Sequence, residues 1–70
     1  MKRHILNFTV EELNLMAIYD TSSRAALLDD LLTARQDVYD SEMLDIFDSA
    51  IEKLETLGEL EFFDIQAVIN

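Results

Sequence analysis

The strongest constraint on the fold of this chain is an apolar stripe at helical spacing in residues 41–57. Apolar side chains recur there every three or four positions, as they do along one face of an α-helix. The stripe consists of Met43, Leu44, Phe47, Ala50, Ile51, Leu54 and Leu57. Asp40 or Ser41 can cap its start, and Gly58 follows at once, where a left-handed residue commonly ends a helix. The sequence therefore predicts a helix over residues 41–57 with one face turned to a core.

A second helix is predicted over residues 10–19. Thr9 and Glu12 have the spacing of a capping box, and Phe8 and Leu13 are placed for a hydrophobic staple. The apolar residues fall on two faces, with Val10, Leu13, Met16 and Ala17 on one and Leu15, Ile18 and Tyr19 on the other. The helix is therefore amphipathic at its start and apolar on nearly all sides at its end.

A third helix is predicted over residues 23–36. The polar residues 20–23 are good caps and poor helix-interior residues, so they form a tight connection and the N-cap of this helix. Arg24 and Arg35 project toward its apolar side. Each can lay its aliphatic stem on the core and keep its charged end in water. Alternatively, Arg24 pairs with Asp20 or another acid and fixes the turn.

The scarcity of residues that break regular backbone sets the fold class. One Gly and no Pro occur in 70 residues, which suits helices joined by short polar loops. We expect residues 59–70 to form a short helical turn and a tail packed over the other helices, and residues 1–8 to be a leader. The predicted fold is all-α, a small three-helix bundle with a short fourth C-terminal helical turn, in a single domain over residues 1–70.

Residue types that carry catalysis or bind metal are scarce. Cys is absent and His4 is the only His, which excludes thiol chemistry, disulfides and metal sites built from Cys and His. A single Gly excludes a phosphate-cradling loop. The outer side of the helix over residues 41–57 carries one stripe of acids, Asp45, Asp48, Glu52 and Glu55. Such a stripe lacks the burial and convergence that acid–base or metal chemistry needs. We therefore expect no catalytic, cofactor-binding or metal-binding residues and a protein that is not an enzyme.

The charge of the chain argues against direct binding to nucleic acid. Fifteen acids stand against five bases, and the formal net charge is −10. A duplex-binding surface must neutralise phosphates with Lys and Arg. A helix-turn-helix is disfavoured for the same reason, because its recognition helix would carry Asp29, Asp30 and Asp37. The acids form either a solvated surface or a surface for a basic partner.

The chain also lacks the features of a membrane protein. No apolar run approaches the ~20 residues that a membrane span needs. The start MKRHILNF is too short, and too polar afterwards, to be a secretory signal. We therefore expect a soluble cytoplasmic protein with no membrane contact.

The first third of the chain resembles a known family. Residues 7–31 read NFTVEELNLMAIYDTSSRAALLDDL. The start NFTVEE, the apolar core LM followed by IYDTS, and Arg24 before the next helix are similar to the opening of the putative transposon-transfer assisting protein family. These are small bacterial proteins encoded on conjugative transposons. The resemblance implies a mobile-element setting and a role in transfer of the element. It supplies no catalytic residue, no cofactor and no partner.

From these observations we expect a non-enzymatic accessory or adaptor protein that acts through contacts with an unknown protein. The candidate partner-binding residues are Leu15, Ile18, Tyr19, Asp20, Arg24, Phe62 and Phe63. The alternative is an acidic regulator that inhibits a basic DNA-binding protein of the element by mimicking DNA, with direct DNA binding less favoured still. We expect the chain to be a monomer or a weak homo-oligomer.

Overall fold

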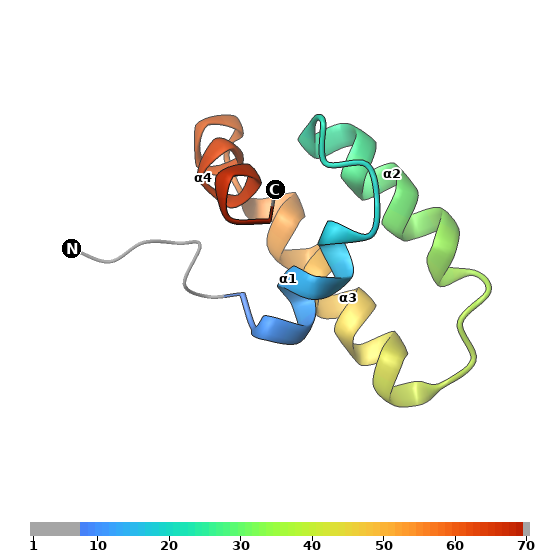
Figure 1. Cartoon of the computed structure of the whole chain (residues 1–70). Coiled ribbons are helices and arrows are strands. Elements are labelled where there is room, and N and C mark those ends of the chain that lie inside the picture. Colours follow the sequence, from blue (N-terminus) through green and yellow to red (C-terminus); the bar gives the residue numbers. More distant parts are fainter. Residues whose placement is uncertain (1–7, 70) are drawn as a thin grey trace.

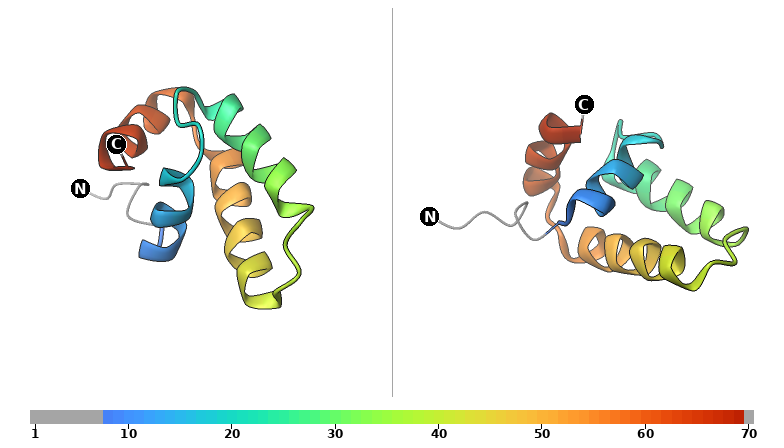
Figure 2. Two further views of the ribbon diagram at one scale, coloured as in Figure 1. Left: turned by 45° about the vertical axis from the view of Figure 1, so that its right-hand side comes forward. Right: turned by 60° about the horizontal axis from the view of Figure 1, so that its bottom comes forward.

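The computed structural model describes residues 8–69 and folds them into four helices with no strand among these residues. They are α1 (Val10–Ala17), α2 (Arg24–Arg35), α3 (Ser41–Thr56) and α4 (Glu59–Ile69). α2 and α3 run side by side in opposite directions, α1 lies against α3, and α4 packs against α1 (Figures 1 and 2). The predicted all-α class is therefore confirmed for this part of the chain. Apart from Phe8, the predicted leader over residues 1–8 lies outside the described residues.

Thr9 caps α1 as predicted, and the caps of α2 and α3 are Ser23 and Asp40, each among the residues that the sequence offered for that role. The hydroxyl of Thr9 accepts from the amide of Glu12 at 3.1 Å, and the Glu12 carboxylate accepts from the amide of Thr9 at 2.9 Å, which completes the capping box. Ser23 caps α2 through an amide three residues on, at 3.0 Å. Asp40 caps α3 in the same way at 3.3 Å. Three helix starts are thus fixed by local hydrogen bonds that the sequence reveals.

α1 is two residues shorter than predicted and ends at Ala17 rather than at residue 19. The amides of Ile18 and Tyr19 each bond to a carbonyl three residues earlier at 3.2 Å, which tightens the last turn and ends the α-helical ladder. The chain then turns at Asp20, whose carboxylate accepts from the amide of Ser22 at 3.0 Å. The hydrogen bonds that the polar side chains of this corner make with the backbone compete with those of the helix, and α1 therefore ends early.

The boundary between α3 and α4 corrects two predictions. Gly58 is not left-handed, since the described residues contain no glycine with positive φ. Instead, its amide donates to the Glu61 carboxylate at 3.0 Å and its carbonyl accepts from the amide of Phe62 at 3.0 Å, as at the start of a helix. Leu57 ends α3 in an extended conformation. The predicted short turn is thus a full helix of 11 residues, which buries Phe62 and Ile65.

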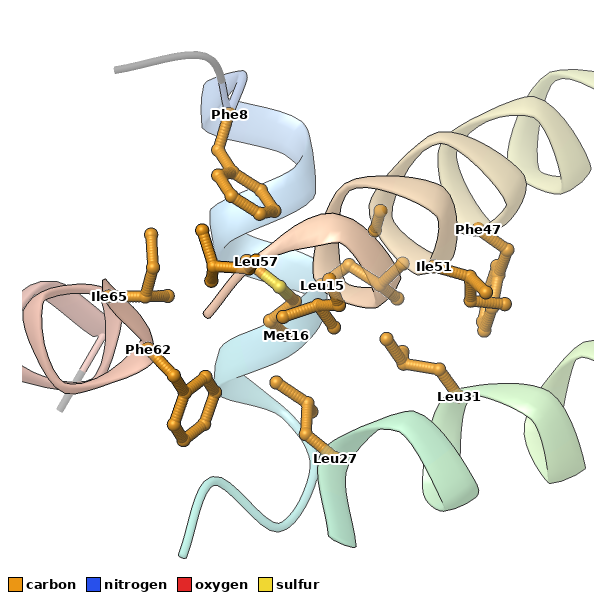
Figure 3. Packing of buried hydrophobic residues seen from close by; sticks show 12 residues of the cluster. Phe8, Leu15, Met16, Leu27, Leu31, Phe47, Ile51, Leu57, Phe62 and Ile65 are labelled. Atoms are coloured by element: carbon orange, nitrogen blue, oxygen red, sulfur yellow. The ribbon is translucent and has the colours of Figure 1, made fainter. Parts of the chain in front are cut away.

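The core is built around the short helix α1. Met16 is fully buried near the middle of the core, with Phe62 and Ile65 of α4 on one side and Phe47 of α3 on the other (Figure 3). α2 closes the core from a third direction (Figure 3). The buried apolar residues are Phe8, Leu15, Met16, Leu27, Leu31, Phe47, Ala50, Ile51, Leu54, Leu57, Phe62 and Ile65. The predicted stripe on α3 supplies five of these, but its first residue, Met43, remains 39% exposed.

Two of the three described bases tie α3 to another helix. Lys53 lies 2.8 Å from the buried carboxylate of Glu12 and so joins α3 to α1. Arg35 joins α2 to α3 through both carboxylate oxygens of Asp48. Asp48 was predicted to be one of a stripe of solvated acids, but it forms an ion pair with Arg35. Both side chains of this pair remain partly exposed.

The third base, Arg24, stabilises the junction of α2, α3 and α4. It does not pair with Asp20. Its Nη1 donates to the carbonyl of Leu54 at 3.1 Å, near the C-terminal end of α3, and its Nε lies 3.7 Å from a carboxylate oxygen of Glu59. A cation near a helix C-terminus is favourable for the free carbonyls there. Arg24 thus pairs with another acid, as one of the two alternatives predicted, but the pair lies at this junction and not in the turn over residues 20–23.

A side chain that the sequence did not single out joins α4 to the corner between α1 and α2. The amide nitrogen of Gln66 donates to the carbonyl of Thr21 at 2.6 Å and to that of Ser22 at 3.2 Å. The corner is thus stabilised by a hydrogen bond within it, to Asp20, and by the hydrogen bonds from Gln66 of α4.

Candidate partner-binding groove

An open groove of about 250 Å³ lies between α1 and the first half of α3. It exists because α1 is too short to cover α3. Eight residues of α1 span about 12 Å and sixteen residues of α3 about 24 Å, at 1.5 Å per residue. The groove is lined by Glu11, Asn14, Leu15, Ile18, Met43 and Ile46.

One wall of the groove is a single stripe of α1. Its residues stand at positions i, i+3, i+4 and i+7, so they share one face of the helix: Glu11, Asn14, Leu15 and Ile18. Leu15 is 7% exposed and forms the floor, whereas Ile18 is 73% exposed at the end of the helix. The early end of α1 leaves this isoleucine with no neighbouring turn to cover it.

The other wall comes from the first two turns of α3. Met43 and Ile46 stand three residues apart and therefore on the same side of the helix. Met43 is 39% exposed and Ile46 is half-buried. Met43 was predicted to belong to the core stripe of the helix and Ile46 was not singled out, so the sequence pattern alone did not identify them as lining a surface groove.

The ion pair between the buried Glu12 and the partly exposed Lys53 fixes α1 against α3 beside the groove. Burial raises the pKa of Glu12, but hydrogen bonds from Lys53, Ser49 and the Thr9 amide, together with the charge of Lys53, outweigh it and lower the pKa below its ordinary value. Glu12 is therefore ionised at neutral pH. Lys53 also lies over the ring of Phe8, 5.5 Å from its centroid. These contacts keep the two walls of the groove together.

The rim of the groove carries an acid, and the bases among the described residues form ion pairs elsewhere in the fold. Glu11 makes no ion pair with any other described residue. Arg24, Arg35 and Lys53 each contact an acid of the same fold. Among residues 8–69, the groove therefore has one acid, Glu11, on its rim and no base in its lining.

The arrangement suits apolar contact better than chemistry. Its volume is below the roughly 300–1,000 Å³ of a pocket that encloses a small organic ligand. Its polar lining residues, Glu11 and Asn14, come from one helix and do not converge on a point. In the described part of the chain, no group of three or more His, Cys, Asp or Glu side chains is placed to hold a metal ion. Each helix there is also too short or too polar to traverse a lipid bilayer.

The structure divides the seven candidate residues among different places. Leu15 and Ile18 line the groove. Tyr19 is half-buried and packs edge-on against Phe47, with ring centroids 6.5 Å apart. Asp20 is exposed in the corner after α1, and hydrogen bonds from Ser22 lower its pKa. These residues follow one another in sequence but do not form one surface.

The remaining candidates do not line the groove. Arg24 lies at the junction of α2, α3 and α4. Phe62 is 1% exposed and belongs to the core, so its ring is not on the surface. Phe63 is 59% exposed and, with Leu60 and Val68, forms a second apolar area on α4. None of these three residues lines the groove, and they lie on the side of α4 opposite to Phe62.

Comparison with protein families matches most of the chain. A family profile described as "Putative transposon-transfer assisting protein" matches residues 8–68. No curated protein and no solved structure matches the chain. The profile covers all of the groove-lining residues and both helices that form the groove.

Proposed function

Because the chain belongs to the putative transposon-transfer assisting protein family, we propose that it is a small non-enzymatic accessory protein of a conjugative element. In this proposal it assists transfer in the cytoplasm through contact with another protein. The family description supports the setting in transposon transfer. The contact, its location in the cell and the absence of catalysis are parts of the proposal.

The observation that carries this proposal is the exposed apolar lining of the α1–α3 groove. Ile18 is 73% exposed and Met43 39% exposed, on two different helices that share one groove. Exposed apolar patches rimmed by polar groups commonly mark protein–protein interaction sites. Since an accessory protein needs a contact surface rather than a reacting group, the groove fits such a role.

A second function is favoured by the distribution of charge. The three described bases are paired within the fold, which leaves most of the acids facing solvent. An acidic regulator could use those acids to occupy the DNA-binding surface of a basic protein. Such a complex would weaken steeply with added salt, whereas a complex held by the apolar groove would not. Direct DNA binding is less favoured, because α2 carries Asp29 and Asp30.

The proposal is tested by a transfer assay in cells that carry the element. The gene is deleted and then restored as wild type, as Ile18→Ser or as Val10→Ser. Val10 is 70% exposed on the same helix but does not line the groove, so it controls for loss of an exposed apolar residue. We expect deletion to lower the transfer frequency, and wild type and Val10→Ser to restore it. We expect Ile18→Ser to fail.

The controls separate the parts of the proposal. Unchanged transfer after deletion would contradict a role in transfer. Full restoration by Ile18→Ser would retain that role but exclude the groove as the contact surface. Circular dichroism of each variant shows whether the helices are retained, so that loss of the fold is not mistaken for loss of contact.

A further inference from the structure

We infer that the α1–α3 groove binds a cationic amphipathic helix of the partner protein, an inference that rests on the proposed function. Three properties of the groove favour this occupant. Its walls are two helical stripes, its lining is mostly apolar, and its rim carries Glu11 with no base among the described residues that line the groove.

The shape of the groove suits a helix. The groove is bounded by one stripe of α1 and one stripe of α3, and a ridge of side chains on a third helix packs into such a space. An extended segment would instead need an exposed sheet edge for its backbone hydrogen bonds. Residues 8–69 form no strand that could offer such an edge.

The lining of the groove provides apolar contacts of two kinds. Leu15 forms a rigid floor that is already packed into the core. Ile18 and Met43 project at the surface, where an incoming apolar side chain can cover them. Methionine adapts its shape readily and is common at surfaces that bind helices. The occupant therefore needs apolar residues at i, i+3 or i+4, and i+7.

The rim determines the charge of the occupant. Glu11 lines the groove, and Glu42 precedes Ile46 by one helical turn and so falls at the end of the α3 wall. Both are exposed, and neither forms an ion pair with another described residue. Lys or Arg residues that flank the apolar face of the occupant would complement these carboxylates.

A second copy of the chain does not fit this description. Among residues 8–69, the bases are Arg24, Arg35 and Lys53, and each contacts an acid of its own fold. The helices of a second copy would therefore bring acids toward an acidic rim, which is unfavourable. No helix among residues 8–69 is the cationic one that the rim favours, and the inferred occupant is therefore a helix of a different protein.

The probe for this inference is a synthetic peptide of about 14 residues, roughly four helical turns. It carries Leu at the helical positions described above, Lys on the flanks, and one Trp as a fluorescent reporter, since the chain contains no Trp. Two comparison peptides replace every Lys by Glu or scramble the order of Leu and Lys. We expect the basic helix to bind at least about tenfold more tightly than either comparison peptide and to shift the NMR methyl signals of Ile18 and Met43.

Variants of the protein locate the binding site. Ile18→Ser should weaken peptide binding by about tenfold or more, because an apolar side chain is lost from the contact. Val10→Ser, which alters an equally exposed residue outside the groove, should change it by less than about twofold.

Two double variants separate the rim from the overall charge. Glu11→Gln with Glu42→Gln should weaken binding by about three- to tenfold and flatten its salt dependence. Glu52→Gln with Glu55→Gln removes the same number of charges from exposed positions outside the groove. It should therefore have little effect. Equal weakening by both double variants would overturn the inference, because binding would then reflect net charge alone.

The other outcomes are also decisive. Equal binding of the acidic or scrambled peptide, or no binding of the basic helix, would exclude a cationic amphipathic helix as the occupant. If Ile18→Ser abolished transfer in cells while the basic peptide failed to bind, the proposed function would stand and the occupant would be wrong. If the peptide bound in the groove but deletion left transfer unchanged, the binding site would stand and the proposed function would fall.

Discussion

The side of α1 that faces the core and the side that lines the groove differ in burial and in pairing. On the core side, Met16 is fully buried and Glu12 is paired with Lys53. On the groove side, Ile18 is 73% exposed and Glu11 has no ion pair with another described residue.

The contrast shows how an eight-residue helix serves two purposes. Its core side contributes packing and a buried charge pair, which hold α3 and α4 in place. Its groove side, apart from the buried Leu15, contributes little to packing and keeps apolar surface available. Since the two sets of residues lie on different faces of the helix, substitutions should change stability and binding separately.

The largest expected effect is on the core side. Met16→Ala should lower the free energy of unfolding by about 2 to 5 kcal/mol, because it leaves a cavity in the core where α1 packs on α3 and α4. Ile18→Ser should change it by less than about 0.5 kcal/mol, as expected for an exposed position. Urea denaturation followed by circular dichroism measures both.

Met16→Leu is the control, since it preserves volume and should cost less than about 1.5 kcal/mol. If Met16→Ala left too little folded protein to measure, this milder variant would still give a value. A loss of stability in Ile18→Ser as large as that in Met16→Ala would contradict the distinction between the two sides.

The next effect concerns the charge pair. Lys53→Met should lower the free energy of unfolding by about 1 to 3 kcal/mol at neutral pH, because it leaves the Glu12 carboxylate buried without its cation. Arg35→Met breaks the partly exposed pair with Asp48 and should cost much less. Combining Lys53→Met with Glu12→Gln should recover part of the loss, because Gln keeps the capping box and carries no charge. Equal losses from the two Met variants would show that burial of Glu12 is not decisive.

The same pair predicts a dependence on pH with a definite sign. The pKa of Glu12 is lower in the folded chain than its ordinary value of 4.5. The ionised pair therefore stabilises the fold fully above that ordinary value and progressively less as the pH falls toward the folded pKa. The difference in stability between wild type and Glu12→Gln should be largest at neutral pH and should shrink below about pH 4.5. A difference that grew on acidification would contradict the assignment.

The sequence predicted the local features of this fold well. Thr9 caps α1 as expected, and Ser23 and Asp40 were among the caps that the sequence offered, because a capping hydrogen bond involves residues only three apart. The boundaries of α2 and α3 lie within one residue of the prediction for the same reason.

The features that the sequence did not reveal depend on contacts between distant segments. Glu12 was assigned to the capping box, and its pairing with Lys53, 41 residues away, became visible only in the fold. The groove arises from the difference in length between α1 and α3, and Met43 could not be assigned to it until the position of α1 was known. The one signal available in advance was the polar corner at Asp20, which ends α1 early.

The smallest expected effect lies away from both sides of α1, at Gly58. Its backbone is not left-handed, and an added Cβ would lie 3.5 Å from a carboxylate oxygen of Glu61, an ordinary contact. Gly58→Ser should therefore raise the free energy of unfolding by about 0.5 kcal/mol, since Ser is a better N-cap and restricts the unfolded chain. Thermal denaturation measures the gain, and Gly58→Ala separates the two causes because Ala gives only the second. Peptide binding to the groove should stay unchanged in both variants. A change in binding would show that α4 and the groove are coupled, and that the two sides of α1 are less independent than their burial indicates.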